Sequence, residues 1–212
     1  NDREFIDVAD IYPSANFIYS LNDQTNLRAS YSLTTARPSF KENSAANIYD
    51  PITERFFVGN INLVPTYVDN FDLRWEHYGE ANRFMAISGF YKKFKNPIEI
   101  NYYDVTTPNT LVARNTEEAT VYGLELEMRN SIYANDRYSL SFNVNASLIV
   151  SELEMSDVEL EARQSVALDK NIDTTRELQG QSPYLINAGL NYNILEKDLN
   201  AGLFYNVQGR AL

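Results

Sequence analysis

The sequence contains no cysteine, a single histidine and a single tryptophan. Without cysteine the chain can form neither a disulfide framework nor a thiolate site for catalysis or metal binding. A Ser-His-Asp triad would have one candidate base, His77, and no companion motif surrounds it, so we interpret it as an interfacial residue at a strand end. Apolar runs of about 18 residues are also missing, which excludes a transmembrane α-helix from the sequence.

Basic residues are outnumbered, with 18 Lys and Arg against 29 Asp and Glu, and the formal net charge is −11. A surface of this sign repels phosphates, so we expect no nucleic-acid partner. Glycine-rich phosphate loops, the zinc-binding HExxH motif and the GxSxG nucleophile motif do not occur. The sequence therefore predicts a protein that is not an enzyme, with no catalytic residue, no cofactor and no metal site.

Eight segments alternate between apolar and polar residues, which predicts strands with one apolar and one polar face. In the fifth of them, Leu124 and Leu126 alternate with Glu125. The fourth is apolar on both parities, so its register is left open. The eight segments are residues 14–21, 26–35, 70–78, 83–94, 120–130, 138–151, 183–193 and 199–208.

The connections between these segments are alternately short and long. Short polar turns are expected at residues 22–25, 79–82, 133–137 and 195–198. Long polar loops are expected at residues 36–68, 96–119 and 153–182. Hairpins that are tight at one end and long at the other are typical of a transmembrane, antiparallel, up-and-down β-barrel. In such a barrel the short turns face the periplasm and the long loops are extracellular.

A soluble β-sandwich also alternates, so the polar face must distinguish the two folds. This face is rich in Ser, Asn and Gly, and it carries two expected charge pairs, Arg74 with Glu76 and Glu127 with Arg129. Such residues suit a polar lumen in which side chains hydrogen-bond one another. Aromatic residues near the short-turn end would form an interfacial girdle, and they are Tyr19, Trp75, Phe84, Tyr138 and Tyr192.

Three charged features each allow two interpretations. Glu125 and Glu127 could act as a catalytic carboxylate pair, or form a charge ladder along the wall with Arg129. The acidic residues within 152–161 could bind a divalent cation or bridge a cation to lipopolysaccharide, or they could form a solvated external loop. Three lysines at the loop end could contact outer-leaflet phosphates or be solvated, and they are Lys92, Lys93 and Lys95.

An ordered set of motifs carries a family resemblance. The motifs occupy residues 35–40 (TARPSF), 59–66 (GNINLVPT), 70–76 (NFDLRWE), 90–99 (FYKKFKNPIE), 115–127 (ending YGLELE) and 205–210 (YNVQGR). In order and spacing this set resembles TonB-dependent outer-membrane receptors, and more closely those of Bacteroidetes-type bacteria. The likeness spans nearly the whole chain, although no single motif is specific.

The resemblance implies a 22-stranded barrel in the bacterial outer membrane, plugged by an N-terminal domain. It implies import of a scarce ligand, such as a siderophore, glycan or peptide, with energy delivered through TonB. Residues 1–212 would be a partial β-barrel domain, about eight strands from the C-terminal half, with the plug domain absent. The implied partners are outer-membrane lipid and lipopolysaccharide, TonB through the missing plug, and a surface lipoprotein.

Ligand contact in such a receptor comes from the plug and the extracellular loops. The loop residues whose aromatic or charged side chains suit this role are Phe40, Tyr49, Arg55, Phe56, Tyr102, Tyr103 and Arg114. Two other functions stay open on the residues alone. One is a complete small outer-membrane barrel with a structural or adhesive role, and the other is a soluble β-sandwich that binds carbohydrate.

Overall fold

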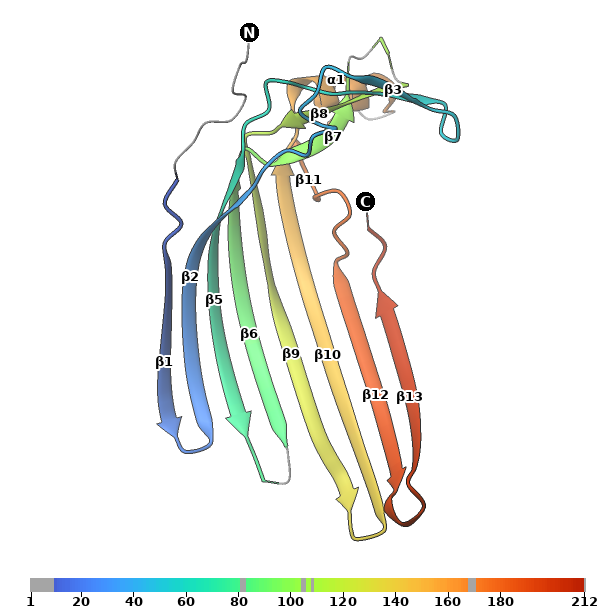
Figure 1. Cartoon of the computed structure of the whole chain (residues 1–212). Coiled ribbons are helices and arrows are strands. Elements are labelled where there is room, and N and C mark those ends of the chain that lie inside the picture. The colour runs from blue at the N-terminus through green and yellow to red at the C-terminus, as the bar shows by residue number, and fades with distance from the viewer. Residues whose placement is uncertain (1–9, 81–82, 104–105, 108, 168–170, 212) are drawn as a thin grey trace.

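The computed structural model describes residues 10–80, 83–103, 106–107, 109–167 and 171–211. Its main feature is a long, curved antiparallel sheet whose eight long strands follow one another in up-and-down order, with the two-residue β11 (Thr175–Arg176) paired to β10 beside this path (Figure 1). The sheet is open, and β1 and β13 form its edges. In order across the sheet, the strands are β1 (Ser14–Asn22), β2 (Thr25–Ala36), β5 (Thr66–Tyr78), β6 (Phe84–Lys95), β9 (Glu118–Ala134), β10 (Tyr138–Glu154), β12 (Tyr184–Ile194) and β13 (Leu199–Gln208).

The eight predicted strands and the all-β barrel-wall fold are confirmed. The largest differences in length are in β9 and β5, which are longer than the predicted segments by six and four residues. A β-bulge between Leu140 and Ser141 shifts the register between β9 and β10. The alternation of apolar and polar residues is interrupted at a bulge, so it does not predict the part of β9 beyond this point. Tight turns close the hairpins with local side-chain hydrogen bonds: Asn22 Oδ1 accepts the Gln24 N–H at 2.9 Å.

The register aligns the apolar residues of neighbouring strands on one face of the sheet. One row across the sheet consists of Phe17, Ala29, Leu73, Gly89, Leu124 and Leu148. Leu124 and Leu148 are 60% and 63% exposed, so no layer of the described chain covers this face as it would in a sandwich. Along β10, the apolar residues from Leu140 to Val150 span about 25 Å at a tilt of about 40°, which matches the apolar band of an outer-membrane barrel.

The structure settles the ambiguous register of β6. Ile87 and Tyr91 pair with Trp75 and Phe71 and so lie on the apolar face. Phe84 lies on the polar face, and its placement in the periplasmic girdle was therefore wrong. The Arg74 guanidinium lies 5.8 Å from the centre of the Phe84 ring, a cation–π contact that accommodates an aromatic ring on a polar wall.

Aromatic side chains mark both ends of the apolar face. Near the short turns, Tyr138 and Tyr192 stack with ring centres 6.1 Å apart. Near the loops, a second set forms one register row on β2, β5, β6 and β9, which we call the outer aromatic row: Tyr31, Phe71, Tyr91 and Tyr122. Two such rows are expected where a barrel meets the two membrane interfaces.

The long connections fold into a second structure above the strands (Figure 1). We call this structure the cap. It contains a four-stranded sheet in the order β3–β4–β8–β7, in which β4 and β8, from two different loops, pair in parallel. The sequence predicts no strand in these stretches, because strands of four to six residues are too short to show a period. The cap elements are β3 (Asn47–Asp50), β4 (Arg55–Val58), β7 (Ile98–Tyr102), β8 (Thr110–Asn115), α1 (Asp157–Val166) and β11 (Thr175–Arg176).

Tightly buried apolar residues gather mainly in the cap and at the loop end of the strands. Leu153 and Ala113 are 1% and 0% exposed, and Leu63 is also buried. A membrane barrel wall has no core of its own, so this compact packing belongs to the cap. Among the helices that the structure describes, none has the length and apolar character needed to cross a membrane.

Candidate ligand-binding site

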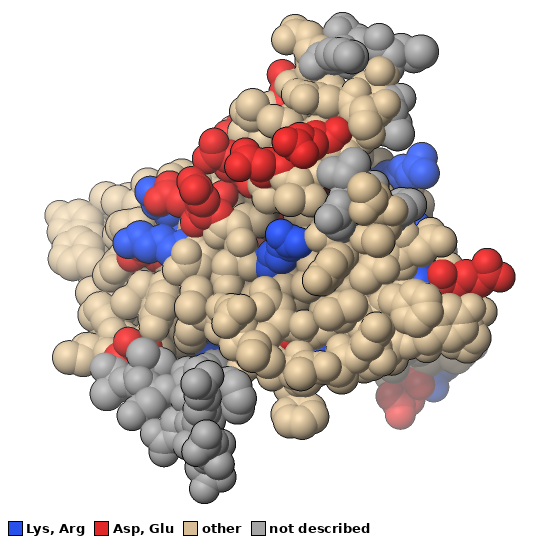
Figure 2. Space-filling view, turned by 90° about the horizontal axis from the view of Figure 1, so that it is seen from above, with Lys and Arg blue, Asp and Glu red and all other residues tan. Residues whose placement is uncertain are grey.

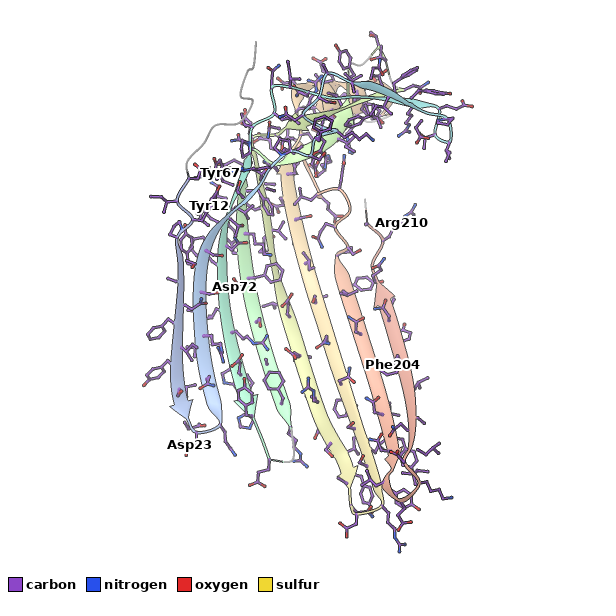
Figure 3. The ribbon with its side chains drawn as sticks, viewed as in Figure 1. Tyr12, Asp23, Tyr67, Asp72, Phe204 and Arg210 are labelled. Carbon is purple, nitrogen blue, oxygen red and sulfur yellow. The ribbon has the colours of Figure 1, made fainter. Side chains whose placement is uncertain are left out.

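A cavity of about 770 Å³ lies between the polar face of the sheet and the underside of the cap. Its floor comes from β5, β6, β9 and β10, and its roof includes residues 97–99 and 178–181. Asp72, labelled in Figure 3, belongs to the floor on β5. The cavity therefore opens on the side of the wall that forms the lumen of a closed barrel.

One register row of the polar face builds the centre of the floor. Asp72, Phe90, Gly123 and Ile149 occupy matching positions on four neighbouring strands. Ser30 donates a hydrogen bond to Asp72 Oδ2 at 3.3 Å. Charges of both signs surround this row, on Arg37, Glu42, Lys92, Glu99 and Glu125. Such a lining can hold a polar ligand through directed hydrogen bonds while an aromatic ring contacts its apolar parts.

Gly123 determines how the Phe90 ring lies on the floor. A Cβ atom at Gly123 would lie 2.2 Å from the Leu148 carbonyl oxygen and 2.8 Å from Phe90 Cζ. Only glycine therefore permits both the close approach of β10 and the position of the Phe90 ring. The Lys92 ammonium lies 5.7 Å from the ring centre, so the cation and the ring form one surface.

Arg176 joins two loops into the roof of the cavity. Its Nη2 lies 2.5 Å from Glu99 Oε2 on β7, and its Nε lies 2.6 Å from Glu159 Oε1 on α1. All three side chains are buried, with 5–7% of their surface exposed. The backbone N–H of Gln179 donates to Glu99 Oε1 at 3.0 Å, which fixes the roof segment to the same carboxylate. We call Glu99, Glu159 and Arg176 the cap clamp.

The clamp changes the interpretation of the acidic segment 152–161. Glu159 is not solvated, and both of its oxygens accept hydrogen bonds, from Arg176, Arg163 and Asn101. Within the described ranges, no group of three or more histidine or carboxylate side chains is arranged to hold a metal ion. Burial acts to raise the pKa of Glu159, but the two arginines outweigh it, so the pKa lies below its ordinary value of 4.5.

The clamp is expected to open in acid. Because the folded-state pKa of Glu159 is lowered, its stabilisation is complete above the ordinary value of 4.5 and is lost as pH falls through the folded-state pKa. Spin labels on Tyr102→Cys and Glu161→Cys would report the separation of β7 and α1. Their distance distribution should be unchanged from pH 7 to pH 5 and broaden below about pH 4. Glu159→Gln should broaden it already at pH 7, and broadening between pH 7 and pH 5 in the unsubstituted clamp would contradict this assignment.

The seven predicted ligand-contact residues lie on the cap and its connections, and none of them lines the cavity beneath it. Tyr103 and Arg114 do meet, since Arg114 Nη2 donates to the Tyr103 carbonyl at 2.6 Å, and both line a second cavity of about 600 Å³. Tyr49 and Phe56 pair with ring centres 4.9 Å apart. The other three are exposed at separate points of the cap: Phe40 before β3, Arg55 at the start of β4 and Tyr102 at the end of β7.

The floor residues carried a sequence signal, whereas the roof residues did not. Asp72 and Glu125 belong to the polar parity of predicted strands, so alternation alone places them on the lumen side. The sequence places Lys92 at the loop end, and the register of β6 is needed to show which face of the sheet it lies on. Glu99 and Gln179 come together from two loops, and no local pattern indicates that contact.

Closer to the short turns, the polar face carries a ladder of ion pairs. Arg74 Nε lies 2.8 Å from Glu76 Oε1, which confirms the expected pair, and Arg28 Nε lies 2.7 Å from Glu76 Oε2. Glu127 pairs with Arg74 at 2.8 Å, on a strand two positions away in the sheet, and not with Arg129 as expected. The ladder occupies Glu127 as a structural partner, which favours the charge-ladder interpretation over a catalytic carboxylate pair.

Comparisons with known proteins agree with this geometry. A family model described as "TonB dependent receptor-like, beta-barrel" matches residues 2–212. No curated protein matches the chain in sequence. Among solved structures, the siderophore receptor PirA from Pseudomonas aeruginosa is similar with a TM-score of 0.62 and 17% identity, covering 93% of this chain and 34% of that chain.

Two further structures show the same likeness of fold. A mutant of the ferric enterobactin receptor PfeA from Pseudomonas aeruginosa has a TM-score of 0.61 and 17% identity, covering 93% of this chain and 27% of that one. PirA from Acinetobacter baumannii has a TM-score of 0.56 and 19% identity, covering 86% and 26% respectively. The chain thus spans about a third or less of the length of these structures, and at these identities the likeness is one of fold.

Proposed function

Because this chain belongs to the TonB-dependent receptor β-barrel family, we propose that it forms part of the wall of an active importer in the bacterial outer membrane. The outer-membrane location follows from the family. Import of a ligand is the proposed function, and this function does not require the chain to catalyse a reaction. Its role is to provide a stable wall, a polar lumen surface and folded loops that hold a ligand at the entrance.

The cavity beneath the cap is the single observation that carries this proposal. It combines a fixed floor on the wall with a roof from two extracellular loops. A wall with only a structural role has no need of a polar cavity on its lumen side. A complete small barrel is disfavoured by the open sheet, whose edges β1 and β13 remain unpaired in the described chain.

The remaining parts of the proposal concern the whole receptor. We propose that a plug domain couples this wall to TonB, which delivers the energy for import. Outer-membrane lipid and lipopolysaccharide would surround the apolar face, and a surface lipoprotein would contact the cap from outside. The seven loop residues given above are proposed to contact the ligand before it enters the cavity.

The charge of the loop end bears on the class of ligand. Figure 2 shows this end from above, where acidic side chains gather in a band and basic ones are scattered. Such a surface slows the approach of highly anionic molecules at low ionic strength. The structural neighbours are named as receptors for siderophores and ferric enterobactin. We propose that neutral glycans and peptides be tested beside siderophores.

Reversing the charge of Lys92 tests the cavity. In the intact receptor, Lys92→Glu should lower uptake at least about tenfold, because it removes a charge-assisted contact of about 1.5–3 kcal/mol and adds another acid to a cavity that already contains Asp72 and Glu125. Lys95→Glu is the matched control. Lys95 lies three residues further along β6, is exposed, and points to the outward face of the sheet and away from the cavity. Growth would be measured with single siderophores, oligosaccharides or peptides as the limiting nutrient, in cells that lack the native receptor.

Heat-modifiable migration in detergent shows whether each variant is folded. Equal uptake by both variants, with every folded protein present at wild-type level, would contradict a role for the cavity. Loss of uptake in both would indicate that the charge of the loop end matters and that the cavity does not.

A further inference from the structure

The cavity beneath the cap is lined by charges of both signs that no ion pair balances. Among the residues that the structure describes, Lys92, Asp72 and Glu125 take part in no ion pair. Asp72 accepts a hydrogen bond from Ser30 Oγ at 3.3 Å, but a hydroxyl group does not balance its negative charge. Charges that line a concave site attract groups of opposite sign from solution. These three side chains are therefore available to a ligand.

The charged side chains nearby are already matched. The ladder nearer the short turns pairs its members with one another at 2.7–2.8 Å, and they are Arg28, Arg74, Glu76 and Glu127. Within the cavity lining, Glu99 pairs with Arg176, and Glu42 Oε2 accepts the Ser39 N–H at 2.7 Å. The polar face thus separates charges that hold the structure together from charges that face the cavity.

The unpaired charges are ordered by sign along the strands. Lys92 lies nearest the cap, and the register places Asp72 two residues and Glu125 four residues further from it. Arg37, which follows the loop end of β2, adds a second cation on the side of Lys92. Phe90 shares the row of Asp72. The cavity therefore presents positive charge toward the cap, negative charge at greater depth and an aromatic ring between them.

We propose that this cavity binds short peptides whose amino and carboxyl termini are both free. From the rise per residue and the strand spacing, the backbone at Lys92 lies about 8 Å from that at Asp72 and about 14 Å from that at Glu125. An extended peptide of about two to four residues covers this range. Its carboxylate lies at Lys92, its ammonium group at Asp72 or Glu125, and a side chain contacts the Phe90 ring.

The charge pattern distinguishes such a peptide from other polar ligands. A neutral glycan would balance neither the cations nor the acids of the cavity. A polyanionic ligand would balance Lys92 and Arg37 but would meet like charges at Asp72 and Glu125. A zwitterion is the class of ligand that satisfies both ends, and the volume of about 770 Å³ is ordinary for a ligand of this size.

This inference rests on the proposed function, because it names the ligand of the same cavity, but its test requires no transport. The purified intact receptor in detergent would be equilibrated by dialysis with a mixture of random di-, tri- and tetrapeptides. Four forms would be compared: both termini free, N-acetylated, C-amidated and capped at both ends. Bound peptide would be counted by mass spectrometry. Peptides with free termini should bind at least about tenfold more tightly than either singly capped form, because each cap removes one charge-assisted contact.

Substitutions at the two ends of the cavity should remove the two preferences separately. Lys92→Gln should abolish the discrimination against amidated peptides and keep the discrimination against acetylated ones. Asp72→Asn combined with Glu125→Gln should do the reverse. Lys95→Gln and Glu152→Gln remove one charge of each sign from the outward face, and both controls should stay within about twofold of wild type. Heat-modifiable migration shows that each variant is folded.

The outcomes separate this inference from the import proposal. Equal binding of the four peptide forms to the folded wild type, or unchanged preferences in both cavity variants, would overturn the peptide assignment. Growth on single siderophores or oligosaccharides would in that case leave import standing. Both preferences in the wild type, each lost in its own variant, would support the assignment even in a receptor that takes up none of the nutrients offered.

Discussion

Replacing Arg176 by alanine is expected to release the cap while leaving the barrel wall folded. The change leaves Glu99 and Glu159 buried without the cation that both contact, and breaking a buried ion pair in this way costs about 3–5 kcal/mol. The cap should therefore open locally. Amide hydrogens of β7 and α1 should exchange at least about 100-fold faster than in the wild type. Heat-modifiable migration should not change.

Arg163→Ala is the matched control for this effect. Arg163 contacts the same carboxylate, Glu159, from one helical turn away, but 40% of its side chain is exposed. A helix pair of this kind contributes about 0.3–0.5 kcal/mol, so exchange should change by less than about threefold. If both substitutions have the same small effect, then the cap is held by apolar packing and the clamp is incidental.

An arginine placed on the apolar face should block assembly, whereas one placed on the next residue should not. Ala146 lies near the middle of the apolar residues of β10 and pairs with Leu126 and Ile186. Ala146→Arg should cost about 2–4 kcal/mol, the penalty for arginine near the bilayer midplane. The folded fraction in outer membranes should fall accordingly, measured by heat-modifiable migration of the intact receptor.

Ser147→Arg provides the comparison at the adjacent position. Ser147 points to the other face and pairs with Glu125, so an arginine there gains an acidic neighbour in a wet lumen. Its folded fraction should match the wild type. Equal loss in both variants would mean that β10 is buried on both faces, and equal tolerance would mean that both faces contact water.

The strands of the wall could be predicted because the alternation that specifies each strand lies within its own stretch of sequence. Strict alternation decides which side of each strand faces lipid, and a one-residue slip would reverse every side chain, so the pattern specifies the register strongly. The register was left open for β6, where Phe84 and Phe90 are aromatic residues on the polar face. Phe90 fits there because Gly123, on the neighbouring strand, leaves room for its ring. That relation joins residues 33 positions apart, beyond the reach of a periodicity count.

The cap and the cavity could not be predicted for a related reason. The strands of the cap have two to six residues, and the parallel partner of β4 is β8 from a different loop. Arg176 contacts Glu99 across 77 residues of sequence. The loop residues predicted as ligand contacts therefore lie on the cap. The cavity beneath the cap is built from wall residues and from a roof that only tertiary contacts assemble.

The central claim is that alternate side chains of the long strands contact lipid and a wet lumen. The chain has no cysteine, so single cysteines can be introduced from position 143 to 148 of β10 and spin-labelled in the reconstituted receptor. Collision rates with oxygen, which concentrates in hydrocarbon, and with a water-soluble nickel chelate would be measured at each position. We expect oxygen to dominate at Val144, Ala146 and Leu148, and the chelate at Asn143, Asn145 and Ser147. A profile without this period of two would contradict the account.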